Sequence, residues 1–181
     1  TEFPTKEFLK NAKTDSDLMT YDSLSSYEQL VCKCASVLGI EFKREMLSYI
    51  MANSTDRMIG KAVIKLFELH IFACATPKSA EISMEKKTSD MLSCNCVKLV
   101  VFQSCRDLVK YSCCANLKFL RDGFRKVVYE SLTERQRVEY HRRALIYLHM
   151  ESRTCESCGS GHFPELIYED FDFGFRDGML N

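Results

Sequence analysis

Three stretches of helical apolar periodicity follow one another between residues 25 and 70, and this succession constrains the fold more than any other feature. The first stretch begins at Ser25, whose spacing from Glu28 predicts a capping box, and ends at Gly39, which tolerates the left-handed backbone that stops a helix. Its apolar positions recur every three or four residues: Tyr27, Leu30, Val31, Cys34, Ala35 and Leu38. The pattern predicts an amphipathic helix of about four turns.

Two further helices are expected directly after it. The second would bury Met46, Leu47, Ile50 and Met51. The third, capped by Ser54 or Thr55, would bury Ile59, Ala62, Val63, Leu66, Phe67 and His70, with His70 as a core histidine. Only residues 53–55 separate these two helices, so the sequence predicts a helix-turn-helix core.

The apolar period changes from helical to extended after residue 70. Residues 71–75 are apolar and compatible with a strand that Pro77 ends, residues 78–93 form a polar loop, and residues 97–102 and 116–120 predict two further strands. Helices followed by strands around a long loop are typical of a winged helix with an expanded wing. The predicted fold class is therefore mainly α with a small β component.

The same pattern divides the chain into four parts. Residues 1–20 read as a linker with one short turn, and residues 21–121 as a winged-helix domain with an insertion around residues 76–96. Residues 122–152 predict a helical hairpin, with Asp122 capping its first helix and a capping box at Thr133 and Gln136 opening its second. The second helix is expected to pack through Val138, His141, Leu145 and Leu148, and residues 153–181 form an irregular tail.

Charge and cysteine content narrow the functional classes. The 181-residue chain has 25 basic and 25 acidic residues, and this neutral total gives no support to bulk binding of nucleic acid or anionic membrane. We expect no signal peptide, because the first residues lack an apolar core, and no apolar run is long enough to cross a membrane. Several of the chain's ten cysteines lie inside apolar helical segments. This placement indicates small buried thiols in a reducing compartment. We expect a cytoplasmic location, with the nucleus as an alternative. We also expect the chain to be a piece of a longer protein.

One short motif has the spacing of metal ligands. Cys155 and Cys158 stand two residues apart, and His162 follows closely. Two thiolates and an imidazole can bind zinc, but a structural zinc site takes four protein ligands and the sequence offers no evident fourth. A cysteine-containing turn in a glycine-rich loop is the competing interpretation.

A second constellation is basic. Arg57, Lys61 and Lys65 recur every four residues on the expected third helix and so share one face. In a winged helix this is the recognition helix, and its cations could meet phosphates in a major groove. A solvated helix face is the alternative, favoured by the neutral total and by the lack of side chains that read base edges. No nucleophile–base pair or phosphate-binding loop is evident, so we expect no catalytic and no cofactor-binding residue in this chain.

Two phrases carry a resemblance to a known family. Residues 24–42, LSSYEQLVCKCASVLGIEF, and residues 116–147, NLKFLRDGFRKVVYESLTERQRVEYHRRALIY, resemble the winged-helix region of signal-transduction P-loop ATPases. Within that group they look most like the middle region of the soluble, bicarbonate-responsive adenylyl cyclases.

The resemblance implies a regulatory function. Upstream cyclase domains of such a protein would convert ATP to cyclic AMP and diphosphate with magnesium or calcium, and this chain would be a non-catalytic module. Its partners would be the neighbouring P-loop ATPase and helical-repeat domains of the same chain. A DNA-binding winged helix acting through Arg57, Lys61 and Lys65 is the alternative, and a zinc-stabilised interaction module a third.

Overall fold

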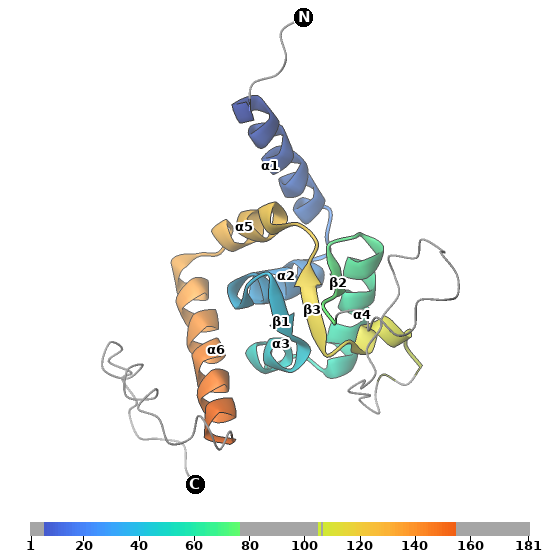
Figure 1. Ribbon diagram of the computed structural model, residues 1–181, viewed down its shortest axis with the longest axis vertical. Helices are drawn as coiled ribbons and strands as arrows, with labels where there is room; N and C mark the ends of the chain where they lie inside the picture. Colours follow the sequence, from blue (N-terminus) through green and yellow to red (C-terminus); the bar gives the residue numbers. More distant parts are fainter. Residues whose placement is uncertain (1–5, 77–104, 106, 155–181) are drawn as a thin grey trace, which may run out of the picture. The chain divides into compact units, whose positions relative to one another are not determined.

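The computed structural model describes residues 6–76, 105 and 107–154 (Figure 1). It is mainly helical with one small sheet, which confirms the predicted fold class. In chain order the elements are α1 Lys6–Asp22, α2 Ser26–Leu38, β1 Glu41–Lys43, α3 Arg44–Ile50, α4 Asp56–Glu68, β2 Phe72–Cys74, the 3-10 helix η2 Lys110–Cys113, β3 Asn116–Phe119, α5 Asp122–Glu130 and α6 Glu134–Thr154. The chain divides into two compact units, Thr1–Ala144 and Leu145–Asn181; the last turns of α6 are the described part of the second.

The sheet is three-stranded and antiparallel, with β3 in the middle and the order β1-β3-β2 (Figure 1). Three phenylalanines, one from each strand, hold it together. The ring of Phe42 lies 5.5 Å from that of Phe72, and the ring of Phe119 lies 4.9 Å from that of Phe72. The predicted strands at residues 71–75 and 116–120 are confirmed, whereas β1 is a strand that the sequence pattern did not predict.

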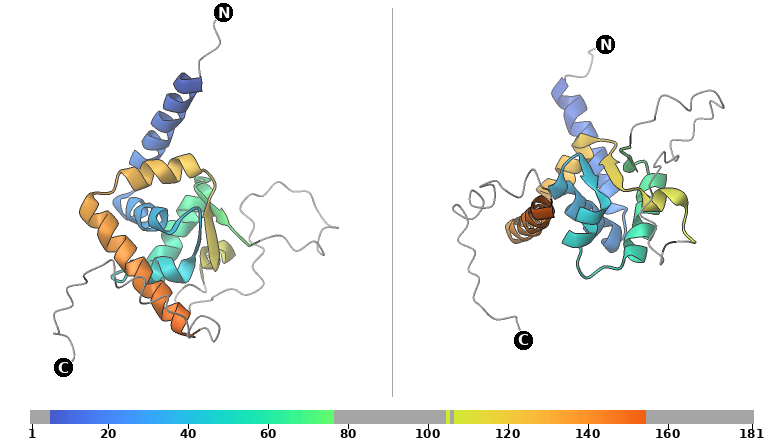
Figure 2. Two further views of the ribbon diagram at one scale, coloured as in Figure 1. Left: turned by 60° about the vertical axis from the view of Figure 1, so that its left-hand side comes forward. Right: turned by 60° about the horizontal axis from the view of Figure 1, so that its bottom comes forward.

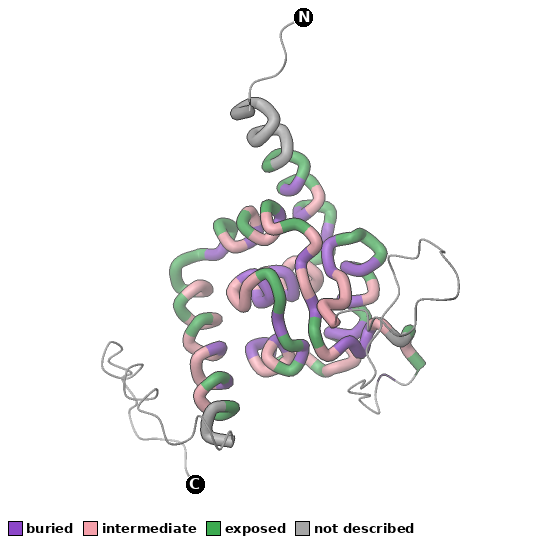
Figure 3. Tube along the Cα trace, viewed as in Figure 1, coloured by how far each residue is buried: buried purple, intermediate pink, exposed green. Residues whose placement is uncertain are grey.

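Three helices, α2, α3 and α4, form the core beside this sheet, and the buried residues gather on them (Figure 3). The predicted capping box opens α2: Ser25 Oγ accepts from the amide of Glu28, and Glu28 Oε2 accepts from the amide of Ser25 at 2.8 Å. Gly39 ends the helix with a φ of 111°. Cys32 and Cys34 are buried on α2 among apolar side chains, as predicted for these two thiols.

Within the predicted linker at residues 1–20, the described residues from Lys6 onward are helical instead. Here α1 continues to Asp22 and packs against α5 (Figure 2). Asp17 is 5% exposed, and its Oδ1 forms an ion pair with Nη1 of Arg121 at 2.5 Å. Its Oδ2 lies 3.3 Å from the position that a Cβ on Gly123 would occupy. A carboxylate at the first turn of α5 is favourable because unpaired amides gather there. This contact with a distant helix is what the local sequence could not reveal.

The two helices predicted over residues 122–152 are present as α5 and α6, with two corrections. The N-cap of α5 is Arg121, and Asp122 lies inside the first turn, where it pairs with Arg125 and Lys126. The capping box at Thr133 and Gln136 is confirmed by hydrogen bonds of 3.1 and 3.3 Å. The packing face of α6 was predicted wrongly, because three of its four residues are exposed: Val138, His141 and Leu148.

Several predictions fall outside the described residues. These are the polar loop at residues 78–93 with most of the insertion around residues 76–96, the strand at 97–102, and nearly all of the tail at 153–181. Within the part of the chain that the structure describes, no helix combines the length and the apolar character that crossing a membrane requires.

Candidate functional site

The exposed face of α4 carries the basic residues singled out in the sequence. Thr55 caps this helix, its Oγ1 accepting from the amide of Met58, and one face enters the core through Ile59, Ala62, Val63, Leu66 and Phe67. Arg57, Lys61 and Lys65 lie on the opposite side. His70 does not share the buried stripe: α4 ends at Glu68, and His70 is exposed with a φ of 55°, so its assignment to the core was wrong.

Two of these three cations have carboxylate partners. Arg57 donates from both terminal nitrogens to Asp107, at 2.5 and 2.7 Å, and Lys65 Nζ lies 3.5 Å from Glu68. The hydrogen bonds from Arg57 are the main reason that the pKa of Asp107 falls to about 2, and the charge of Lys61 lowers it further. The face is therefore less cationic than its sequence suggests.

Asp107 begins a short segment, Asp107–Cys113, that we call the strap. It contacts α4 at three places in the same order along both segments. Arg57 binds Asp107; at Gly60 an added Cβ would lie 3.0 Å from Leu108; and the ring of Phe67 stacks on Tyr111 at 5.0 Å. Gly60 thus leaves room for the strap, which covers one side of α4.

Behind the strap lies a buried arginine that sequence reasoning missed. Arg44, the first residue of α3, is 1% exposed and donates from Nη2 to the carbonyl of Asp56 at 3.0 Å. Burial lowers its pKa, while three surrounding thiols raise it: Cys113, Cys105 and Cys114. Arg44 thereby links α3, the start of α4 and the strap. An arginine that opens a helix gives no sequence signal for such burial.

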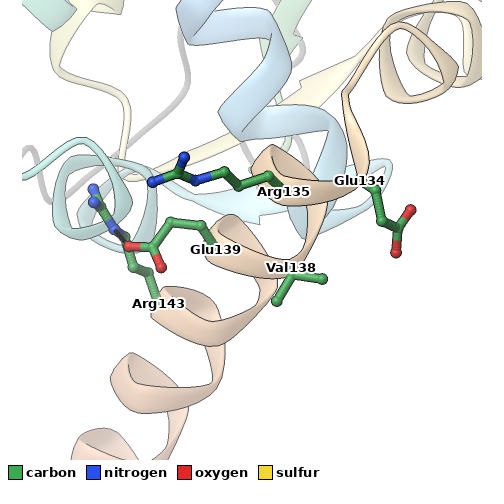
Figure 4. Close-up of a pocket in the computed structure, with 5 residues that line it drawn as sticks. All are labelled: Glu134, Arg135, Val138, Glu139 and Arg143. Atoms are coloured by element: carbon green, nitrogen blue, oxygen red, sulfur yellow. Dashed lines mark hydrogen bonds and ion pairs between the residues drawn. The ribbon is translucent and has the colours of Figure 1, made fainter.

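An open hollow lies along α6 (Figure 4). Its volume is about 600 Å³, and its lining is Glu134, Arg135, Val138, Glu139 and Arg143. Glu139 accepts hydrogen bonds from Arg142 at 2.9 and 3.0 Å and from Arg143 at 2.6 Å. These bonds, above all those from Arg142, hold the pKa of Glu139 at about 2. A carboxylate that stays ionised between two arginines suits an ion-pair network better than proton transfer.

One histidine of the first unit, His141, has a defined hydrogen-bond partner. His141, on α6, forms a hydrogen bond of 3.0 Å with the hydroxyl of Tyr129 on α5. Partial desolvation of its otherwise exposed ring, and then the charge of Arg137, lower its pKa. Among the described residues, the hydrogen-bond partner of His141 is this tyrosine. Among those same residues, no group of three histidine, cysteine, aspartate or glutamate side chains could hold a metal ion. The predicted zinc ligands Cys155, Cys158 and His162 lie outside the described part of the chain.

Comparison with known proteins gives one distant relationship. The chain is 24% identical over 175 residues to adenylate cyclase type 10 of Oryctolagus cuniculus, and 23% and 22% identical over the same length to those of Rattus norvegicus and Mus musculus. Each alignment covers 91% of this chain but only 11% of the relative. No family model matches the sequence, and no solved structure matches it. The chain is thus distantly similar to a small part of a mammalian adenylate cyclase.

Proposed function

We propose that this chain is a non-catalytic regulatory module of a larger adenylyl cyclase-related protein. The similarity to adenylate cyclase type 10 across 91% of the chain is the observation that carries this proposal. The alignment takes up 11% of that relative, which leaves ample length for separate cyclase domains. Those domains would convert ATP to cyclic AMP and diphosphate with magnesium or calcium.

The order of elements supports a winged helix as the form of the module. A helix, a strand, two helices and two strands follow one another as α2, β1, α3, α4, β2 and β3, and the third strand lies between the other two. We propose that the module packs against a P-loop ATPase domain and helical repeats of the same polypeptide, and transmits the nucleotide state between them. Surfaces built from ion pairs and exposed apolar residues, as on α4 and α6, are compatible with docking.

Two measurements test the proposal. The first is the sequence of the full-length polypeptide, in which cyclase domains and a P-loop ATPase should precede this region. The second is formation of cyclic AMP from ATP by the purified full-length protein with magnesium or calcium, compared with this chain alone. We expect activity only in the full-length protein. A full-length protein with unrelated neighbouring domains and no cyclase activity would refute the proposal.

The alternative, a DNA-binding winged helix, rests on the cationic face of α4. The ion pairs of Arg57 with Asp107 and of Lys65 with Glu68 reduce its attraction for phosphates. We predict that fluorescence anisotropy detects no binding of the chain to duplex DNA at low salt, where non-specific binding is strongest. Salt-dependent binding that disappears when Arg57, Lys61 and Lys65 are all replaced by alanine would instead establish the alternative.

A further inference from the structure

Four exposed residues form a continuous stripe along α4. Met58, Lys61, Lys65 and the C-cap residue Leu69 follow one another at steps of three and four residues, so they lie on one side of the helix and its C-terminal end. Met58 is 47% exposed and Leu69 is 38% exposed, which leaves an apolar side chain at each end. The two lysines stand between them, one helical turn apart. We call these four residues the α4 stripe.

The side of α4 next to the stripe already binds a carboxylate. Asp107 of the strap is held by two hydrogen bonds from Arg57, at 2.5 and 2.7 Å. The charge of Lys61 also acts on Asp107, because it contributes to the low pKa of that carboxyl group. The strap therefore shows that the cationic side of this helix binds a carboxylate. Its own carboxylate reaches Arg57, at the edge, while the lysines of the stripe remain exposed.

The composition of the stripe distinguishes between kinds of partner. A DNA backbone offers phosphates but nothing for Met58 and Leu69, and binding to it depends on neutralising many charges at once. Two lysines in a chain of zero net charge supply little of that. A protein segment can offer acidic and apolar side chains together, and an amphipathic helix places them on one side.

We propose that the α4 stripe is the docking surface for an acidic amphipathic helix of a partner protein segment. Two carboxylates one turn apart on that helix would pair with Lys61 and Lys65, and an apolar side chain on either side would contact Met58 and Leu69. This proposal rests on the proposed regulatory function, because it identifies the surface through which the module would bind its partner. Glu68, 3.5 Å from Lys65, is the internal carboxylate that the partner displaces or shares.

A peptide that mirrors the stripe tests this docking. The probe is a labelled synthetic helix of about 18 residues, with leucine, glutamate, glutamate and leucine at the spacing of the stripe on an alanine–glutamine background. Its binding to this chain is measured by fluorescence anisotropy in dilute salt. We expect saturable binding that weakens as salt is added, because exposed charges are screened. The same peptide with lysines in place of the glutamates should not bind.

Matched variants assign the binding to the stripe. We expect Lys61→Glu with Lys65→Glu to weaken binding by about tenfold or more, and Met58→Ser with Leu69→Ser by about fivefold. Arg135→Glu and Val138→Ser make comparable changes on exposed positions of α6, and they should alter affinity by less than about twofold. Circular dichroism checks that each variant remains folded.

The proposal is overturned if the acidic peptide does not bind, or if the α6 variants weaken it as much as the stripe variants do. It is also overturned if duplex DNA displaces the peptide and binds with an affinity that Met58→Ser and Leu69→Ser leave unchanged. If the peptide does not bind but the full-length protein has cyclase activity, only the docking surface is refuted. Stripe-dependent binding in a protein without cyclase activity refutes only the proposed function.

Discussion

Arg143 joins α6 to the core through one hydrogen bond, and a second hydrogen bond within α6 orients its side chain. Its Nη1 donates to the carbonyl of Ile50 at 2.8 Å, at the end of α3, where the last carbonyls of a helix lack partners within it. Its Nε donates to Glu139 at 2.6 Å, which fixes the direction of the guanidinium. Beside it, Tyr140 forms a hydrogen bond with the Cys34 thiol. The pKa of Tyr140 and the pKa of Cys34 are both raised to about 12, mainly because the two groups are buried. Short polar contacts, rather than a broad apolar face, hold this part of α6.

Replacing Glu139 should change how stability depends on acid. Its pKa is about 2 in the folded chain, against an ordinary value of 4.5, because Arg142 and then Arg143 donate hydrogen bonds to it. The ion pairs therefore stabilise the fold fully above pH 4.5 and are lost as the pH falls toward 2. We predict that Glu139→Gln lowers the free energy of unfolding at pH 7 by up to about 1 kcal/mol, since the group is partly exposed.

Urea unfolding at pH 7 and at pH 3 measures this effect. The difference between the variant and the original chain should shrink at the lower pH, where the carboxylate of Glu139 loses part of its advantage. Glu134→Gln is the matched control, because the side chain of Glu134 is 79% exposed and lies in the first turn of the same helix. Equal destabilisation by both substitutions would contradict the assignment to Glu139.

The docking of α1 on α5 depends on one buried carboxylate. Asp17 lies against the first turn of α5, while Tyr21 enters the core one turn later. We predict that Asp17→Ala destabilises α1 by roughly 1–3 kcal/mol, because it leaves Arg121 without this partner and removes a charged group from the N-terminus of α5. Amide hydrogen exchange should rise in α1 while α2 to α4 stay protected. Asp15→Ala, on the exposed side of α1, is the control and should leave exchange unchanged.

Elements whose signals are local could be predicted from the sequence, and those that depend on distant contacts could not. The capping boxes at Ser25 and Thr133 are set by neighbouring residues, and both are present. In contrast, α1 is polar and becomes part of the fold through Asp17 and α5. The strap escaped prediction for the same reason, since Arg57 and Asp107 are 50 residues apart in sequence.

The orientation of α6 shows a different limit. Apolar periodicity favoured Val138 and Leu148 as packing residues, yet Val138 is 54% exposed and Leu148 is 43% exposed. Within the first unit the helix contacts the core through Tyr140, Arg143 and Ala144. A tyrosine and an arginine carry apolar carbon atoms beneath polar ends, so a binary apolar–polar pattern misjudges the face that they bury. The candidate site was likewise predicted only in part. The sequence identified the cations of α4, but it did not identify the carboxylates that pair with them.

At the scale of the whole molecule, neutrality comes from two unequal parts: residues 1–144 have 23 basic and 18 acidic residues, and residues 145–181 have 2 basic and 7 acidic residues. Within the first part, many charges are paired locally. Charges of opposite sign stand three or four residues apart on single helices in several places: Lys65 with Glu68, Lys126 with Asp122, and Arg142 and Arg143 with Glu139. Such pairs cancel at short range, because exposed charges are screened within about 10 Å at ordinary salt. These pairs shorten the range over which the basic excess of residues 1–144 acts, so charge contributes most where a partner makes close contact, as at the α4 stripe.

Zinc binding by the C-terminal motif is the remaining hypothesis for the whole chain, and ligand number argues against it. Cys155, Cys158 and His162 supply three ligands, whereas structural zinc is held by four and then contributes directly to folding. We predict less than stoichiometric zinc by mass spectrometry in the purified chain, and an unchanged melting temperature after EDTA or after Cys158→Ser. One zinc per chain, lost together with thermal stability in that variant, would show that a fourth ligand is recruited and that metal holds the module together.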